Sequence, residues 1–330
     1  MPDLLLFADT ALEGERHRGR CRSGADHGAA DHAETRSEMT GTTVAHWNNV
    51  ITRQQREQFE TYGFLTVKGA LGQEEVARLT EAVDRLHAEE ERAGRLDADG
   101  NMHLLACLFR DEAFLELLDH PATFPIVWGM LGWNIFGFHS HADVHPPLPG
   151  PRPRRWRWHQ DGGRINLEVE TPVTRPRLSV KCSYWLSDAS EPGRGNFMVV
   201  PGSHRTNTLQ RPRNLDDYGE DPPGAVELTA EPGDAIVFDR RIWHTRTDNH
   251  SEVTRKAVFV AYTYRWMRPY DYTEAPAELL ERLSPVRRQL LGEGADPLQY
   301  WGRGDAERPP LFRELDAAGL LDLSVPNQRP

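Results

Sequence analysis

Apolar residues recur at helical spacing in the N-terminal part of the chain. Val76, Leu79, Val83 and Leu86 fall on one face of a helix that the pattern predicts over residues 73–90. A face of this width needs a partner, so we expect this helix to pack along a sheet. Shorter elements are predicted as helices at 52–60, 111–118 and 121–131 and as a strand at 62–67.

Between residues 134 and 264 the pattern changes to short alternating or β-branched runs, separated by Pro and Gly turns. Strands at this spacing predict a barrel or a sandwich. The runs lie at 135–144, 155–161, 177–186, 196–200, 225–229, 235–239 and 255–264. A further helix is predicted over residues 275–291.

The same pattern predicts the division of the chain. Residues 1–40 are rich in charged and small residues, which predicts a disordered tail. Residues 41–270 form one predicted domain, with a helical cap at about 52–131 and a barrel at about 134–270. Residues 271–330 are expected to form a helical and irregular extension. The predicted fold class is therefore mostly β with flanking helices.

Composition excludes several classes of protein. The 330 residues carry a formal net charge of −11, which argues against nucleic acid as a partner. The longest apolar run near the start, residues 4–7, is too short for a signal peptide or a membrane span. Three scattered cysteines do not suggest a disulfide framework, so we expect a reducing cytoplasm. A small molecule is the expected partner, and oligomeric state is left open.

Candidate metal ligands stand out in the segment Trp158-His159-Gln160-Asp161. On a strand, alternation would place His159 and Asp161 on the same face. His244 follows 83 residues after Asp161, at the end of a predicted strand. Two histidines and one carboxylate on one face of a metal leave three positions open, as ferrous oxygenases require.

The open positions also suggest the cofactor. 2-Oxoglutarate can occupy two of them through its keto oxygen and the adjacent carboxylate, and O₂ can take the third. The far carboxylate then needs a cation, for which a guanidinium is the best fit. Arg255 lies 11 residues after His244 and is the candidate.

The sequence around these residues resembles the phytanoyl-CoA dioxygenase family of Fe(II)/2-oxoglutarate oxygenases. The resemblance covers about residues 52–270 and rests on the order and spacing of three pieces. These are His159-Gln160-Asp161, the run from Gly195 to His204 that ends Pro-Gly-Ser-His, and the stretch from His244 through Asn249 to Arg255-Lys256-Ala257.

The resemblance implies a double-stranded β-helix, a jelly-roll barrel with helices outside the larger sheet. It implies His159, Asp161 and His244 as iron ligands and Arg255 as the cofactor arginine. It also places Tyr184, His141 and Gln160 beside 2-oxoglutarate. The sequence departs from the family two residues after the distal histidine, where Arg246 replaces a Ser or Thr that helps to hold the far carboxylate.

A second group of potential ligands remains as an alternative metal site. His139, His141, Asp143 and His145 would share one face of a strand. A cupin-like site would need a glutamate a few residues after His-x-His, and none is present, so we favour the set at 159, 161 and 244.

Three residues are candidates for substrate contact. His139 is expected at the mouth of the barrel, and Arg246 could bind substrate if it does not bind the cofactor. Arg164 belongs to an arginine-rich approach that also includes Arg152, Arg154, Arg155 and Arg157. A solvated loop is the favoured interpretation of that approach.

The predicted function is a 2-oxoglutarate-dependent dioxygenase that hydroxylates a small molecule of secondary or specialised metabolism, with O₂ as co-substrate. A halogenase is disfavoured because it needs the carboxylate position vacated, and Asp161 is present. The alternatives are a cupin-type metalloprotein without 2-oxoglutarate and a non-catalytic binding barrel. The sequence does not name the substrate.

Overall fold

The computed structural model describes residue 47 and residues 50–172, 174–293 and 308–329. The tail predicted at residues 1–40 lies outside these residues. The strands are β1 Phe64–Val67, β2 Met102–Leu105, β3 Ile135–His145, β4 Ser179–Trp185, β5 Phe197–Val199, β6 Val226–Leu228, β7 Ala235–Asp239, β8 His244–Arg246 and β9 Arg255–Tyr264. The longer helices are α1 Arg53–Tyr62, α2 Gln73–Arg92, α3 Phe124–Leu131 and α8 Pro310–Ala317. The shorter helices are η3 Cys107–Phe109, η4 Glu112–Asp119, α4 Ile165–Glu168, η5 Ser203–Arg205, α5 Ala277–Leu280, α6 Pro285–Leu290 and η6 Pro326–Gln328.

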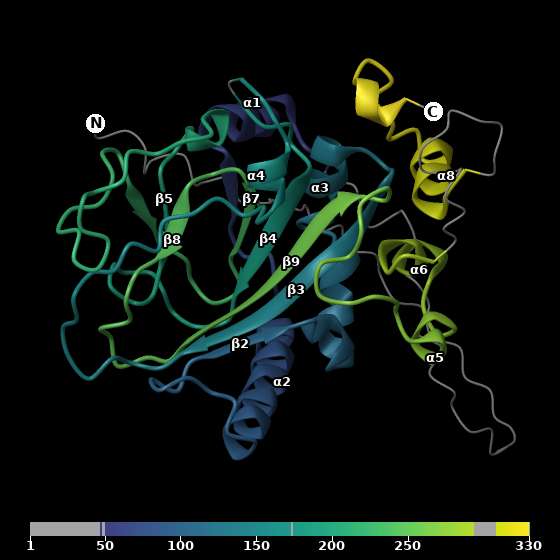
Figure 1. Cartoon of the computed structure of the whole chain (residues 1–330). Coiled ribbons are helices and arrows are strands. Elements are labelled where there is room, and N and C mark those ends of the chain that lie inside the picture. The colour runs from purple at the N-terminus through teal and green to yellow at the C-terminus, as the bar shows by residue number, and fades with distance from the viewer. Residues whose placement is uncertain (1–46, 48–49, 173, 294–307, 330) are drawn as a thin grey trace, which may run out of the picture. The chain divides into compact units, whose positions relative to one another are not determined.

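The strands form two antiparallel sheets. The larger sheet has six strands in the order β1-β7-β4-β9-β3-β2, and the smaller has three in the order β6-β5-β8. Figure 1 shows β4, β9 and β3 side by side, with β5 and β8 standing apart from them. The predicted mostly β fold with flanking helices is confirmed.

The two faces of the larger sheet meet different surroundings. Val180, Cys182 and Tyr184 of β4 join Val258 and Val260 of β9 in the apolar core that the helices complete. The residues between them point the other way, and Trp185 packs with a second apolar cluster that includes strands of the smaller sheet. Alternation along each strand thus separates a helix-covered face from the interior between the sheets.

Helix α1 shows why the chain turns where it does. Thr52 and Gln55 form a capping box at its start, and Gly63 ends it with a φ of 86°. A Cβ on Gly63 would lie 2.6 Å from Nδ1 of His204, so no larger residue fits there. His204 Nε2 lies 3.0 Å from the carbonyl of Glu60, which joins the Pro-Gly-Ser-His turn to α1.

Some predicted elements need correction. Residues 155–161 do not form a strand, and their ladder contact within the described chain is an isolated bridge between His159 and His244. The helix predicted over 275–291 divides into α5 and α6, because Ser284 caps a new helix that begins at Pro285. Strands β2 and β8 were not predicted.

The C-terminal helices belong to the same folded unit as the barrel. Arg287 of α6 donates a hydrogen bond from Nε to Oδ1 of Asp119, at 2.8 Å. The Asp119 side chain is 1% exposed, so Arg287 is the counter-charge of a buried carboxylate. Helix α6 packs against β3 and against η4, the helix that ends at Asp119.

We predict that Arg287→Leu lowers the free energy of unfolding by about 3 kcal/mol, because Asp119 loses its counter-charge while it stays buried. Chemical denaturation measures the change. Arg282→Leu is the matched control, since Arg282 pairs with Glu112 in solvent and should change stability by about 0.5 kcal/mol or less. Equal effects of the two substitutions would contradict the role of the buried pair.

Candidate metal centre and cofactor pocket

The two candidate histidines lie opposite each other on paired backbone. His159 N–H donates to the carbonyl of His244 at 3.0 Å, and His244 N–H donates back to His159 at 2.9 Å. His244 begins β8, so an irregular segment is fixed to a strand at this one point. The alternation expected of a strand is therefore not what brings His159 to the site.

Hydrogen bonds also fix the orientation of both imidazole rings. Nδ1 of His159 lies 2.8 Å from the carbonyl of Arg157, and Nδ1 of His244 lies 2.9 Å from the carbonyl of Ile242. A carbonyl only accepts, so each Nδ1 carries a proton and each Nε2 offers a lone pair to a metal when its ring is neutral. Burial opposes protonation of His159, but Asp161 raises the pKa of that ring. Burial lowers the pKa of His244 to about 3, which keeps that ring neutral.

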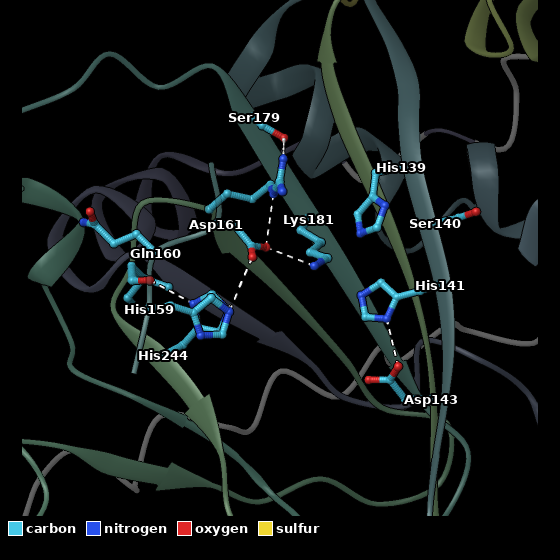
Figure 2. Close-up of polar contacts among 12 residues, drawn as sticks. His139, Ser140, His141, Asp143, His159, Gln160, Asp161, Ser179, Lys181 and His244 are labelled. Atoms are coloured by element: carbon cyan, nitrogen blue, oxygen red, sulfur yellow. Dashed lines mark hydrogen bonds and ion pairs between the residues drawn. The ribbon is translucent and has the colours of Figure 1, made fainter. Parts of the chain in front are cut away.

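Asp161 completes the group. Its Oδ1 lies 3.6 Å from Nε2 of His159 and 3.9 Å from Nε2 of His244, and the three candidate ligand atoms all lie within 4.8 Å of one another. Figure 2 shows the carboxylate directed at the imidazole rings. Two neutral nitrogens and one carboxylate oxygen form a donor set that suits Fe(II).

Two buried cations that sequence reasoning missed hold the other oxygen of this carboxylate. Lys181 Nζ lies 2.9 Å and Arg240 Nε 3.1 Å from Oδ2 of Asp161. Burial opposes ionisation, but Lys181 and Arg240 hold the pKa of Asp161 well below its usual range. Asp161 is therefore ionised without a metal.

The candidate cofactor arginine is buried and incompletely paired. Arg255 Nη1 lies 3.4 Å from Oδ2 of Asp143, and Arg255 Nε is buried without a hydrogen-bond partner among the described residues. Its guanidinium lies over the rings of Trp185 and Phe259, 4.8 and 5.6 Å from their centroids. Burial lowers the pKa of Arg255, and Asp143 opposes that effect. A carboxylate beside Nε would satisfy the unpaired donor.

Arg246 lies in the same region. Burial and then the charge of Arg255 lower the pKa of Arg246 to about 10, so both guanidinium groups stay charged at neutral pH. Arg246 donates one hydrogen bond, to the carbonyl of Thr247 at 3.2 Å. The pocket thus holds two cations close to one carboxylate, Asp143.

The alternative ligand group on β3 is divided among other partners. His139 pairs with Asp271, and His145 lies 2.9 Å from the side chain of Asn101. A second possible cluster does exist, but it joins His141 and Asp143 to His103 of β2. In it, Asp143 already accepts from both rings, at 2.7 and 3.0 Å, and it also faces Arg255. Both oxygens of Asp143 thus have protein partners, whereas Oδ1 of Asp161 faces the two candidate ligand nitrogens.

Other sequence-predicted residues fall in different places. His141 stacks on Phe259 with centroids 4.3 Å apart, and its buried Nε2 has no hydrogen-bond partner in the part of the chain that the structure describes. Tyr184 lies on the helix-covered face, where its hydroxyl contacts Thr123 and Leu117, so the structure does not bring it to the pocket. Trp185, which follows Tyr184 in the chain, lies beside Arg255 instead, as does Phe259.

Gln160 and Arg164 also point elsewhere. Gln160 Nε2 donates to the carbonyls of Thr206 and Arg241, and Figure 2 shows its side chain directed away from Asp161. Arg164 pairs with Glu168 on the surface, with 81% of its side chain exposed. Neither geometry supports the predicted cofactor or substrate contact.

The residues that sequence reasoning missed carried a partial signal. Lys181 is a charged residue in the middle of an otherwise uncharged strand, and it is one of three lysines in the whole chain. His103 and Arg240 had no such signal, because each reaches the site through contacts between distant segments.

Comparison with known proteins finds a family whose sequences this chain matches. Residues 59–257 match the profile of the family described as Phytanoyl-CoA dioxygenase (PhyH). An ectoine dioxygenase of Bordetella parapertussis is 25% identical over 240 residues, which cover 65% of this chain and 76% of that protein.

Solved structures share the fold. The crystal structure of EctD from S. alaskensis with bound Fe is 23% identical, with a TM-score of 0.50 over 69% of this chain and 83% of that one. HygX from Streptomyces hygroscopicus, solved with nickel and 2-oxoglutarate, is 18% identical, with a TM-score of 0.53 over 70% and 94%. These similarities confirm the predicted jelly-roll barrel.

We predict that the protein binds a single equivalent of Fe(II), and that His159→Ala or Asp161→Ala abolishes retention of the ion, because each substitution leaves two ligands. Anaerobic titration followed by metal analysis measures it. His141→Ala is the control, since His141 belongs to the other cluster. Loss of iron from the control together with retention by His159→Ala would reassign the site.

Proposed function

Because the chain belongs to the phytanoyl-CoA dioxygenase family, we propose that it hydroxylates a small molecule at an iron held by His159, Asp161 and His244. The reaction class predicted from the sequence, a dioxygenase that uses iron and 2-oxoglutarate, is confirmed at the level of the family. The observation that carries the proposal for this chain is the convergence of two free Nε2 atoms and one ionised carboxylate oxygen.

The second part of the proposal concerns 2-oxoglutarate, whose far carboxylate we assign to Arg255. The unpaired Nε, the burial of the guanidinium and the neighbouring Arg246 support this assignment. Iron and 2-oxoglutarate, when bound, supply the activation of O₂. The apolar rings of Trp185 and Phe259 lie against the buried Arg255 guanidinium, and charge interactions are stronger in such surroundings.

The nature of the product follows from Asp161. A halide ligand needs the coordination position that this carboxylate fills, so we propose transfer of oxygen rather than halogen. His139 is the proposed contact for substrate. It lies on the same strand as His141 and is buried beside Tyr270 and Asp271.

We also propose the cytoplasm as the compartment. Cys107 and Cys182 are buried free thiols, as a reducing compartment permits. None of the helices in the described part of the chain has the length and apolar character that crossing a bilayer requires.

We predict that Arg255→Ala weakens the binding of 2-oxoglutarate about a hundredfold, because the far carboxylate loses a charged donor in a buried pocket. Calorimetry on the Co(II)-loaded protein measures the affinity without turnover. Arg246→Ala should weaken it less, since Arg246 already donates to a backbone carbonyl. A larger loss for Arg246→Ala would transfer the role to that residue.

We predict that heavy oxygen from O₂ appears in succinate and in the hydroxylated product, and that succinate release requires 2-oxoglutarate and iron. Mass spectrometry of a metabolite screen in ¹⁸O₂ measures both. The Asp161→Ala protein is the control and should release no labelled product. Turnover that needs no 2-oxoglutarate would favour a cupin-type metalloprotein, and chlorinated product from the native protein would refute oxygen transfer.

A further inference from the structure

The two oxygens of Asp161 have different surroundings. Oδ1 faces the free Nε2 atoms of His159 and His244, whereas Oδ2 accepts hydrogen bonds from Lys181 and Arg240. The Lys181 and Arg240 side chains are only 7% and 10% exposed. Figure 2 shows Lys181 on the side of the carboxylate away from the imidazole rings.

Two buried cations pair with one carboxylate in this arrangement. Lys181 and Arg240 both contact Oδ2 of Asp161, and each buried cation costs solvation energy. The ammonium group of Lys181 has no other carboxylate contact among the described residues, and it lies 5.4 and 5.9 Å from the ring centroids of Phe259 and Phe238. Oδ2 of Asp161 is therefore the carboxylate oxygen to which the described contacts direct the Lys181 ammonium group.

Arg240 approaches the same oxygen from a different direction. Its Nη1 lies 3.5 Å from the hydroxyl of Ser179, and its guanidinium lies 4.9 Å from the ring centroid of Phe138. These contacts fix the guanidinium independently of Asp161. Oδ2 is therefore held from two sides by groups that are themselves anchored.

We propose that Lys181 and Arg240 are positioning residues that restrict Asp161 to binding the metal through Oδ1 alone. A carboxylate can bind a metal through one oxygen or through both. A second bound oxygen would take one of the three positions that 2-oxoglutarate and O₂ require. This inference rests on the proposed metal site.

The same two cations repel a dication a few ångströms away. The site therefore gives up metal affinity to keep a coordination position open. Replacing one cation with an uncharged side chain of similar volume should remove the repulsion and free Oδ2 to bind the metal. The metal should bind at least as tightly, and 2-oxoglutarate should bind more weakly because Oδ2 competes for its position.

The test uses Lys181→Met in the full chain, with Co(II) as an air-stable probe. Calorimetry should give a Co(II) affinity equal to or above that of the native protein and a 2-oxoglutarate affinity about tenfold lower on the Co(II) form, roughly 1.4 kcal/mol. The visible absorption of Co(II) should also change, since it reports coordination number. Arg240→Met should change both affinities in the same direction, and it replaces Lys181→Met in the test if that variant does not fold.

Lys68→Met is the matched control. Lys68 pairs with Asp234 at 2.7 Å, away from the metal ligands, so both affinities should equal those of the native protein. Parallel losses of Co(II) and 2-oxoglutarate affinity in Lys181→Met would show a merely structural role and overturn the proposal. Unchanged 2-oxoglutarate affinity would also overturn it. If Co(II) bound equally well to the native protein and to His159→Ala, the metal site itself would be refuted instead.

Discussion

The antiparallel pairing of β3 with β9 is the constraint on which the site depends. It sets Asp143 opposite Ala257 and His141 opposite Phe259, and it continues to His145 opposite Arg255. Because side chains alternate along both strands, the residues that form the pocket share one face, and Val258 and Val260 turn to the helices. A slip of one residue in this register would send the polar set into the apolar core.

The interior face carries buried charge that the apolar face does not. Lys181 and Arg240 contact Asp161, Arg255 contacts Asp143, and Arg246 adds a further cation beside Arg255. Cations in excess of carboxylates are costly when water is excluded, and an added anion relieves that cost. The excess positive charge on this face therefore favours the binding of an anion.

Sequence reasoning predicted the parts of the site that depend on residue type and order. His159, Asp161, His244 and Arg255 were named from donor chemistry and spacing, and the structure places the first three together. Tyr184 was expected beside the cofactor from the family resemblance alone, whereas the alternation of Ser179, Lys181 and Ser183 with apolar residues along β4 puts Tyr184 on the helix-covered face and Trp185 beside Arg255. The Gln160 side chain lies in a segment without regular strand pairing and points away from Asp161, which the residue pattern did not indicate.

The arginine-rich approach has a structural explanation that composition alone did not give. Arg154 pairs with Asp221, which also accepts from the Trp158 indole and the Tyr218 hydroxyl, and Arg157 pairs with Asp248. These contacts hold a segment that lacks strand pairing next to loops far along the chain. Since that segment ends in His159 and Asp161, the arginines help to fix two proposed ligands where the backbone ladder provides one bridge. The position of the proposed metal site then depends on surface ion pairs as well as on the barrel. High salt should weaken the surface ion pairs more than it weakens the packing of the barrel.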